Sequence, residues 1–204
     1  MEKLLKNENT AGTRPRVDQY RNLRLAILFL ATTLIVTRIL QAEHLFIPRG
    51  IADHILGRRV NDSFLIIGYL LLLFRCVSMR DWRDLYAVAA TGIGGLILVQ
   101  AIKFGSTAMF PHAAFLRRPS TGGGGFPSGH AQASFMLAYM IGARYPKLAI
   151  PAYFVAAIIT WSRVPYEHFF YQIVAGGIVG LAVAVAVESI FERKPVPGNV
   201  TRNA

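Results

Sequence analysis

The sequence predicts an all-α, polytopic membrane protein with six transmembrane helices, and three observations lead to this fold class. Apolar residues make up 53% of the 204 residues, and the mean hydropathy is +0.41. The formal net charge is nevertheless +11, from 22 Lys and Arg against 11 Asp and Glu. The basic residues lie between long apolar runs, which argues against a nucleic-acid binder. The single cysteine, Cys76, excludes an intrachain disulfide and a cysteine-based zinc site.

Six apolar runs are candidates for membrane spans, because a hydrocarbon core about 30 Å thick needs about 20 apolar residues of helix. The runs cover residues 23–40, 63–77, 85–102, 131–143, 148–161 and 169–187. The fourth and fifth runs are short and would be ambiguous alone. Between the first two spans, residues 51–56 predict a short amphipathic helix on the outer surface. We expect a polar segment over residues 1–22, one transmembrane domain over 23–192 whose core bundle carries the active site, and a flexible tail over 193–204.

The distribution of positive charge predicts the orientation of the spans. With both termini in the cytoplasm, the inner segments hold about twice as many Lys and Arg residues as the outer segments. The sequence therefore predicts a plasma (inner) membrane protein with cytoplasmic termini. Glu188, near the inner end of the last span, is interpreted as structural.

Two outer loops contain most of the chemically reactive side chains. The first loop holds Lys103, Arg117, Arg118, glycines 122–125 and the run Pro127-Ser128-Gly129-His130. The second loop holds Arg163, Glu167 and His168. Two spans separate the loops, so both lie on one face of the membrane, outside the cytoplasm.

These residue types suit the binding of a phosphorylated ligand. Lys and Arg bind phosphate oxygens, and glycines allow the backbone to approach a ligand closely. Ser128-Gly129-His130 opens directly into an apolar run, and a helix N-terminus is an anion site. Imidazole can act as a nucleophile or a proton donor near neutral pH, which makes His130 and His168 candidate catalytic residues.

The order of these residues resembles the motifs of the type 2 phosphatidic acid phosphatase superfamily, in its membrane-bound lipid phosphatase branch. Those motifs read Lys-x6-Arg-Pro, then Pro-Ser-Gly-His, then Ser-Arg-x5-His-x3-Asp. The matching residues here are Lys103, Arg118-Pro119, Pro127-Ser128-Gly129-His130, Ser162-Arg163 and His168. The resemblance covers residues 103–177, about a third of the chain.

The resemblance implies a role for each matching residue. His168 is the expected nucleophile, which forms a phosphohistidine, and His130 is the expected general acid. The expected phosphate ligands are Lys103, Arg118, Arg163, Ser128 and the N–H of Gly129, with Arg117 as a rival of Arg118. The resemblance implies hydrolysis without a metal ion or other cofactor.

The chain departs from the motifs at three places. Fourteen residues separate Lys103 from Arg118 instead of six, and residues 111–116 are expected to dip into the interface. Four residues separate Arg163 from His168 instead of five. Gln172 stands where the motif has Asp. Gln172 can orient the ring of His168 through its carbonyl oxygen but adds no charge, and Glu167 is the alternative replacement.

The leading functional interpretation is an integral membrane phosphatase acting on a lipid phosphate or diphosphate. Phosphatidylglycerol phosphate, phosphatidate, an isoprenyl diphosphate and lipid A 1-phosphate all fit as substrates. A phosphotransferase of the same family is an alternative, because a phosphohistidine can pass its phosphoryl group to a lipid. A non-catalytic anion-binding membrane protein is a second alternative, favoured by the replaced Asp and opposed by the two histidines.

Overall fold

The computed structural model describes residues 16–43, 48, 50–118, 124–164 and 166–191, and this part of the chain is helical and contains no strand. The long helices are α2 (Arg16–Ala42), α3 (Asn61–Ser78), α4 (Trp82–Met109), α5 (Gly129–Arg144), α6 (Ala149–Ser162) and α7 (Phe170–Phe191). Short helical segments are η2 (Ile51–Val60), η3 (Ala114–Leu116) and η4 (Pro146–Leu148).

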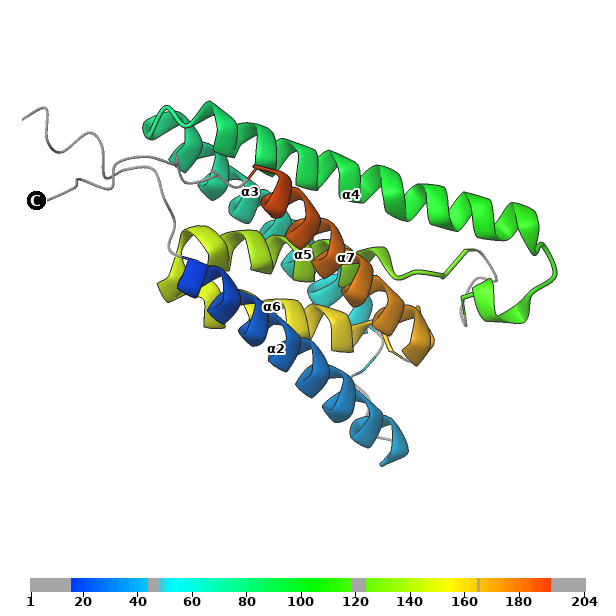
Figure 1. Cartoon of the computed structure of the whole chain (residues 1–204). Helices are drawn as coiled ribbons and strands as arrows, with labels where there is room; N and C mark the ends of the chain where they lie inside the picture. The colour runs from blue at the N-terminus through cyan, green and yellow to red at the C-terminus, as the bar shows by residue number, and fades with distance from the viewer. Residues whose placement is uncertain (1–15, 44–47, 49, 119–123, 165, 192–204) are drawn as a thin grey trace, which may run out of the picture.

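Helix α5 lies at the centre of the bundle and contacts the five other long helices (Figure 1). Most of its residues are buried, which explains why this helix is apolar on every side. Its closest partner is α7, whose Gly176 and Gly180 face the backbone oxygens of Ser128 and Gln132 on the α5 side. A Cβ at either glycine would overlap these oxygens, so the two backbones lie in direct contact.

Within the part of the chain that the structure describes, four helices are long and apolar enough to cross a membrane. They span residues Tyr20–Ala42, His54–Ser78, Trp82–Met109 and Phe170–Phe191. Many of their large apolar side chains are exposed, as expected for surfaces that face lipid. Helices α5 and α6 form where the fourth and fifth runs predict them, but they have only 16 and 14 residues. The six-span topology therefore stays a prediction.

The segment between the first two spans differs from the sequence-based expectation. Residues Ile51–Val60 form a π-type helix that leads directly into α3 at Asn61, where the backbone N–H of Asn61 bonds the carbonyl of Leu56. This segment packs against α6 as well as α3. Ala52 is almost fully buried in that contact. The separate helix on the outer surface is thus not confirmed.

Charged side chains pair at one end of the bundle, which we call the ion-paired end. Arg144 at the end of α5 donates from Nη2 to Asp84 Oδ1 at 2.5 Å and from Nη1 to Glu188 Oε1 at 2.6 Å. Arg75 adds a 2.8 Å bond to the other oxygen of Asp84. The interpretation of Glu188 as structural agrees with this network. Helix α4 begins at this end, whereas α5 and α7 end here, so the end of α4 and the starts of α5 and α7 meet at the other end, which we call the site end.

Candidate active site

The N-terminus of α5 forms one wall of the site end. Ser128 is the N-cap, and its Oγ accepts the N–H of Ala131 at 3.4 Å. The N–H groups of Gly129 and His130 then point out of the first turn without intrahelical partners. Lys103, on α4, brings its Nζ to 3.6 Å from the position that a Cβ at Gly129 would occupy. The sequence motif therefore builds a positively polarised helix end beside a lysine.

The start of α7 is fixed to this helix end. The N–H of Ser128 donates to the carbonyl of Gln172 at 2.9 Å, and Ser128 itself is fully buried. The contact of Gly176 with the Ser128 carbonyl holds the next turn of α7 in place. His168 precedes α7 by two residues, so these contacts set its position relative to α5.

The side chain of Gln172 holds His168 in one tautomer. Gln172 Nε2 donates to two backbone carbonyls, of Phe115 at 3.1 Å and of Arg117 at 2.9 Å. Its Oε1 accepts the N–H of Phe169 at 3.2 Å and lies 3.0 Å from Nδ1 of His168. These four contacts fix which end of the amide is oxygen, so Nδ1 of His168 must carry the hydrogen.

The other ring nitrogen of His168 consequently bears a lone pair. His168 is 1% exposed, and its Nε2 has no hydrogen-bond partner among the described residues. A buried polar atom without a partner is rare in native proteins and calls for a functional explanation. A nucleophile awaiting a ligand is such an explanation.

Burial is the main reason that the pKa of His168 falls from 6.5 to about 3. The hydrogen bond to Gln172 opposes this shift, whereas the nearby charges of Arg118, His130 and Lys103 add to it. At neutral pH the ring is therefore uncharged. An uncharged ring is the form whose nitrogen can attack an electrophile.

The structure distinguishes the two candidate arginines. Arg118 faces the site, where its Nη1 donates to Glu167 Oε2 at 3.2 Å and its Cγ lies close to Gly125. Arg117 is exposed and reaches the site only through its backbone carbonyl. Glu167 thus faces Arg118, while Gln172 occupies the place beside His168 that the motif gives to Asp.

The side chains of Arg163 and His130 both contact the backbone of segment η2. Arg163 is 4% exposed and donates from Nη2 to the carbonyl of Ala52. A Cβ at Gly57 would overlap the Arg163 guanidinium, so a larger residue there would displace that guanidinium. The imidazole of His130 hydrogen-bonds the backbone of Gly57. The sequence did not identify Ala52 and Gly57 as neighbours of the site. The signal available for Gly57 was that a glycine within an apolar periodic stretch indicates close packing.

Backbone hydrogen bonds shape the short loop between Arg163 and His168. The N–H groups of Glu167 and His168 both donate to the carbonyl of Arg163, at 3.1 and 2.9 Å. This turn brings His168 inward despite the missing residue. Pro119, Ser120, Gly122, Gly123 and Pro165 lie outside the described residues. Among the residues that are described, no group of three or more His, Cys, Asp or Glu side chains could hold a metal ion.

A family model matches the part of the chain that contains these residues. The model of the PAP2 superfamily matches residues 83–195, which is more than half of the chain. The matched region begins in α4, contains Lys103, His130 and His168, and extends past the end of α7. Comparisons with curated proteins and with solved structures returned no match. The match and the motif order agree, and the chain belongs to the PAP2 superfamily, the type 2 phosphatidic acid phosphatases.

Proposed function

We propose that the protein is an integral membrane phosphatase that removes phosphate from a lipid phosphate monoester or diphosphate through a phosphohistidine intermediate. The observation that carries the proposal is the state of His168, buried, held at Nδ1 by Gln172, and lacking a partner at Nε2. The active face lies outside the cytoplasm and the substrate reaches it from the bilayer.

The proposed reaction has two steps. In the first, Nε2 of His168 attacks phosphorus, a P–N bond forms, and the bond from phosphorus to the leaving oxygen breaks. Burial and the charges of Arg163, Arg118 and Lys103 lower the pKa of His130 to about 4, and the hydrogen bond to Gly57 opposes the shift. The negative charge of the bound phosphate group favours the protonated imidazole, so His130 takes up a proton on binding. It donates this proton to the leaving oxygen, and the dephosphorylated lipid departs. In the second step, water attacks phosphorus, the P–N bond breaks, His130 takes up the water proton, and inorganic phosphate leaves.

The cations and the helix end supply the electrostatic stabilisation that this reaction needs. Charge on the equatorial phosphoryl oxygens must be neutralised in the transition state. Lys103, Arg118 and Arg163 are the proposed side-chain ligands, and the N–H of Gly129 and the hydroxyl of Ser128 are further donors. Because Ser128 Oγ accepts from Ala131, its own hydrogen is available for the phosphate.

The test is phosphate release by the purified protein from a panel of lipid phosphates and diphosphates. We expect His168→Ala to lower kcat by about 10⁴-fold or more, and vanadate, which mimics the five-coordinate phosphoryl group, to inhibit the wild type. Activity that survives in His168→Ala would reject the nucleophile assignment. Measuring phosphorylated lipid beside free phosphate separates the hydrolase from a phosphotransferase, and binding of vanadate without either product would indicate an anion-binding protein.

A further inference from the structure

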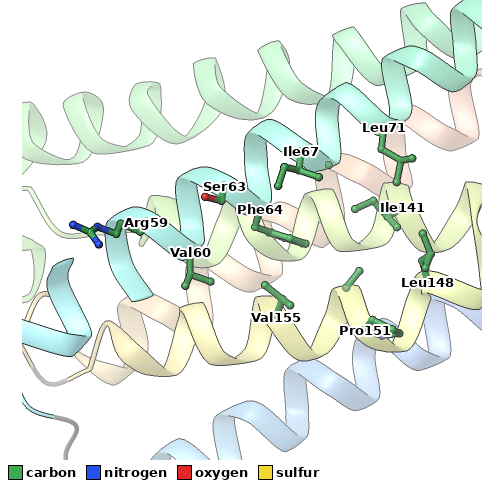
Figure 2. A pocket seen from close by; sticks show the side chains of 12 residues that line it. Arg59, Val60, Ser63, Phe64, Ile67, Leu71, Ile141, Leu148, Pro151 and Val155 are labelled. Atoms are coloured by element: carbon green, nitrogen blue, oxygen red, sulfur yellow. The ribbon is translucent and has the colours of Figure 1, made fainter. Parts of the chain in front are cut away.

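A groove runs along the bundle between α3 and α6, with α5 as its floor (Figure 2). Its volume is 490 Å³, within the range of about 300–1,000 Å³ that small-molecule sites occupy. Twelve residues line it, and nearly all are aliphatic or aromatic, including Phe64, Ile67, Leu71, Ile141 and Val155.

The groove is polar at one end only. Arg59 and Ser63 stand at one end, and Leu71 and Leu148 stand at the other (Figure 2). The order from charged to apolar matches a molecule with an anionic head and a hydrocarbon tail. A soluble ligand would require polar groups along the whole length.

The polar end of the groove lies on the segment that also contacts the candidate active site. Arg59 lies two residues beyond Gly57, in the same η2 segment. Gly57 packs against the Arg163 guanidinium and hydrogen-bonds His130. A phosphate held by Arg163 would thus place the first carbons of its lipid at the mouth of the groove.

The groove is also open to the bilayer. Ile67 lines it and is 65% exposed, and it lies on the outward surface of a candidate membrane span. From Ser63 to Leu71 the helix α3 rises about 12 Å at 1.5 Å per residue. This length approaches that of one leaflet, which is about half of a 30 Å hydrocarbon core.

We propose that this groove binds one hydrocarbon chain of the phosphorylated lipid, with Arg59 beside the head group. The inference rests on the proposed function, and it adds the site that selects the substrate by its chain. The competing occupant is a chain of any bilayer lipid that carries no phosphate. The two differ in whether a phosphate anchors the chain at the site end.

The binding test does not depend on turnover. The full chain, in phosphatidylcholine nanodiscs, is irradiated with phosphatidate that carries a diazirine along one acyl chain, and with the matching diacylglycerol probe. We expect the phosphatidate probe to label residues 63–71 and 148–155 about tenfold more strongly than the diacylglycerol probe, and vanadate to remove the difference. Equal labelling by both probes, or phosphatidate labelling elsewhere in the chain, would overturn the proposal.

A matched pair of variants tests the same groove by kinetics. Val155 points into the groove, whereas its neighbour Phe154 is 59% exposed and lies outside the lining (Figure 2). We expect Val155→Trp to lower the ratio of kcat/KM for a long-chain over a short-chain lipid phosphate about tenfold. Phe154→Trp places the same indole on the exposed side of the same helix and should leave this ratio at the wild-type value. An unchanged ratio in Val155→Trp would contradict the proposal. Absence of phosphate release from every lipid would instead refute the proposed function, and the labelling result would still stand.

Discussion

The two ends of the helix bundle hold their charged side chains in different ways. At the ion-paired end, Arg144 is fully buried and bonds both Asp84 and Glu188, so the charges there compensate one another. At the site end, Arg118 pairs with Glu167, and the charges of Lys103 and Arg118 act on both His130 and His168. Arg163 acts on His130. Helices α4, α5 and α7 reach both ends of the bundle (Figure 1). These helices therefore adjoin a compensated cluster at one end and, among the described residues, more cations than carboxylates at the other.

The difference indicates a division of labour along the helices. A buried ion pair contributes little net stability, but removing one partner is costly because the other charge stays buried. The ion-paired end thus fixes how the helices pack. Surplus positive charge at the site end is an unfavourable arrangement that an anionic ligand would relieve. We therefore expect substitutions at the ion-paired end to lower stability, and substitutions at the site end to change activity.

The largest expected effect on stability is at the ion-paired end. Arg144→Met should lower the free energy of unfolding by about 3–5 kcal/mol, because Asp84 and Glu188 would remain buried without this partner. The measurement is unfolding in detergent, followed by circular dichroism. Lys147→Met is the control, since Lys147 is exposed at the same end. If the two variants unfold alike, the network does not fix the packing.

The next largest effect is expected at the side-chain amide of Gln172, which holds the ring of His168. Gln172→Ala should lower kcat about tenfold, because it removes the acceptor at Nδ1 of His168 and strands buried carbonyls. This loss is much smaller than the one expected for His168→Ala. Phosphate release by the two variants gives the comparison. Wild-type activity in Gln172→Ala would eliminate the positioning role.

A charge at the same position should move the pH profile. Gln172→Glu places a carboxylate beside Nδ1, which favours the protonated ring and raises the pKa of His168 from its low value of about 3. His168 reacts in its neutral form, so the acidic limb of kcat/KM should shift to higher pH. The profile is recorded between pH 4 and 8, where the wild type should show no acidic limb from His168 and the variant should show one, with vanadate affinity as a second readout. A variant profile without such a limb would show that the residue at 172 does not act through His168.

The smallest effect is expected at the ion pair of the site end. Arg118 and Glu167 are partly exposed, at 31% and 18% of their side-chain surface, and such pairs contribute about 0–1 kcal/mol. Glu167→Gln should release Arg118 for the ligand and tighten vanadate binding about threefold. The inhibition constant for vanadate measures this change. Weaker binding would mean that Glu167 helps to place Arg118 rather than compete for it.

Hydropathy and motif order were sufficient for the class of fold and the family. The runs beginning at Leu23, Ser63, Leu85 and Phe169 correspond to the four long apolar helices, and the family match confirms the resemblance. These features depend on the composition of continuous segments, which a sequence displays directly. The placement of η2 depended on contacts with α6 and Arg163, and no local pattern encodes such contacts.

Two of the three departures from the motif are connected in the structure. The extra residues before Arg118 and the replacement of Asp by Gln172 are separate features of the sequence. In the folded chain, Nε2 of Gln172 binds the carbonyls of Phe115 and Arg117 within that extra stretch. A carboxylate could not donate these bonds. Tyr171 adds a 2.7 Å bond to the same Phe115 carbonyl. The longer connection thus gives a physical reason for the amide.

The glycine contacts between α7 and α5 limit how the protein can diverge. Where backbone meets backbone at Gly176 and Gly180, no exchange of side chains can adjust the spacing of the two helices. Changes that alter which ligand is accepted must then fall on segments that this contact does not hold, such as the α3 and α6 sides of the groove. Reaction geometry and ligand preference therefore depend on different parts of the chain. Substitutions can change the ligand preference while the geometry of the reacting groups stays the same.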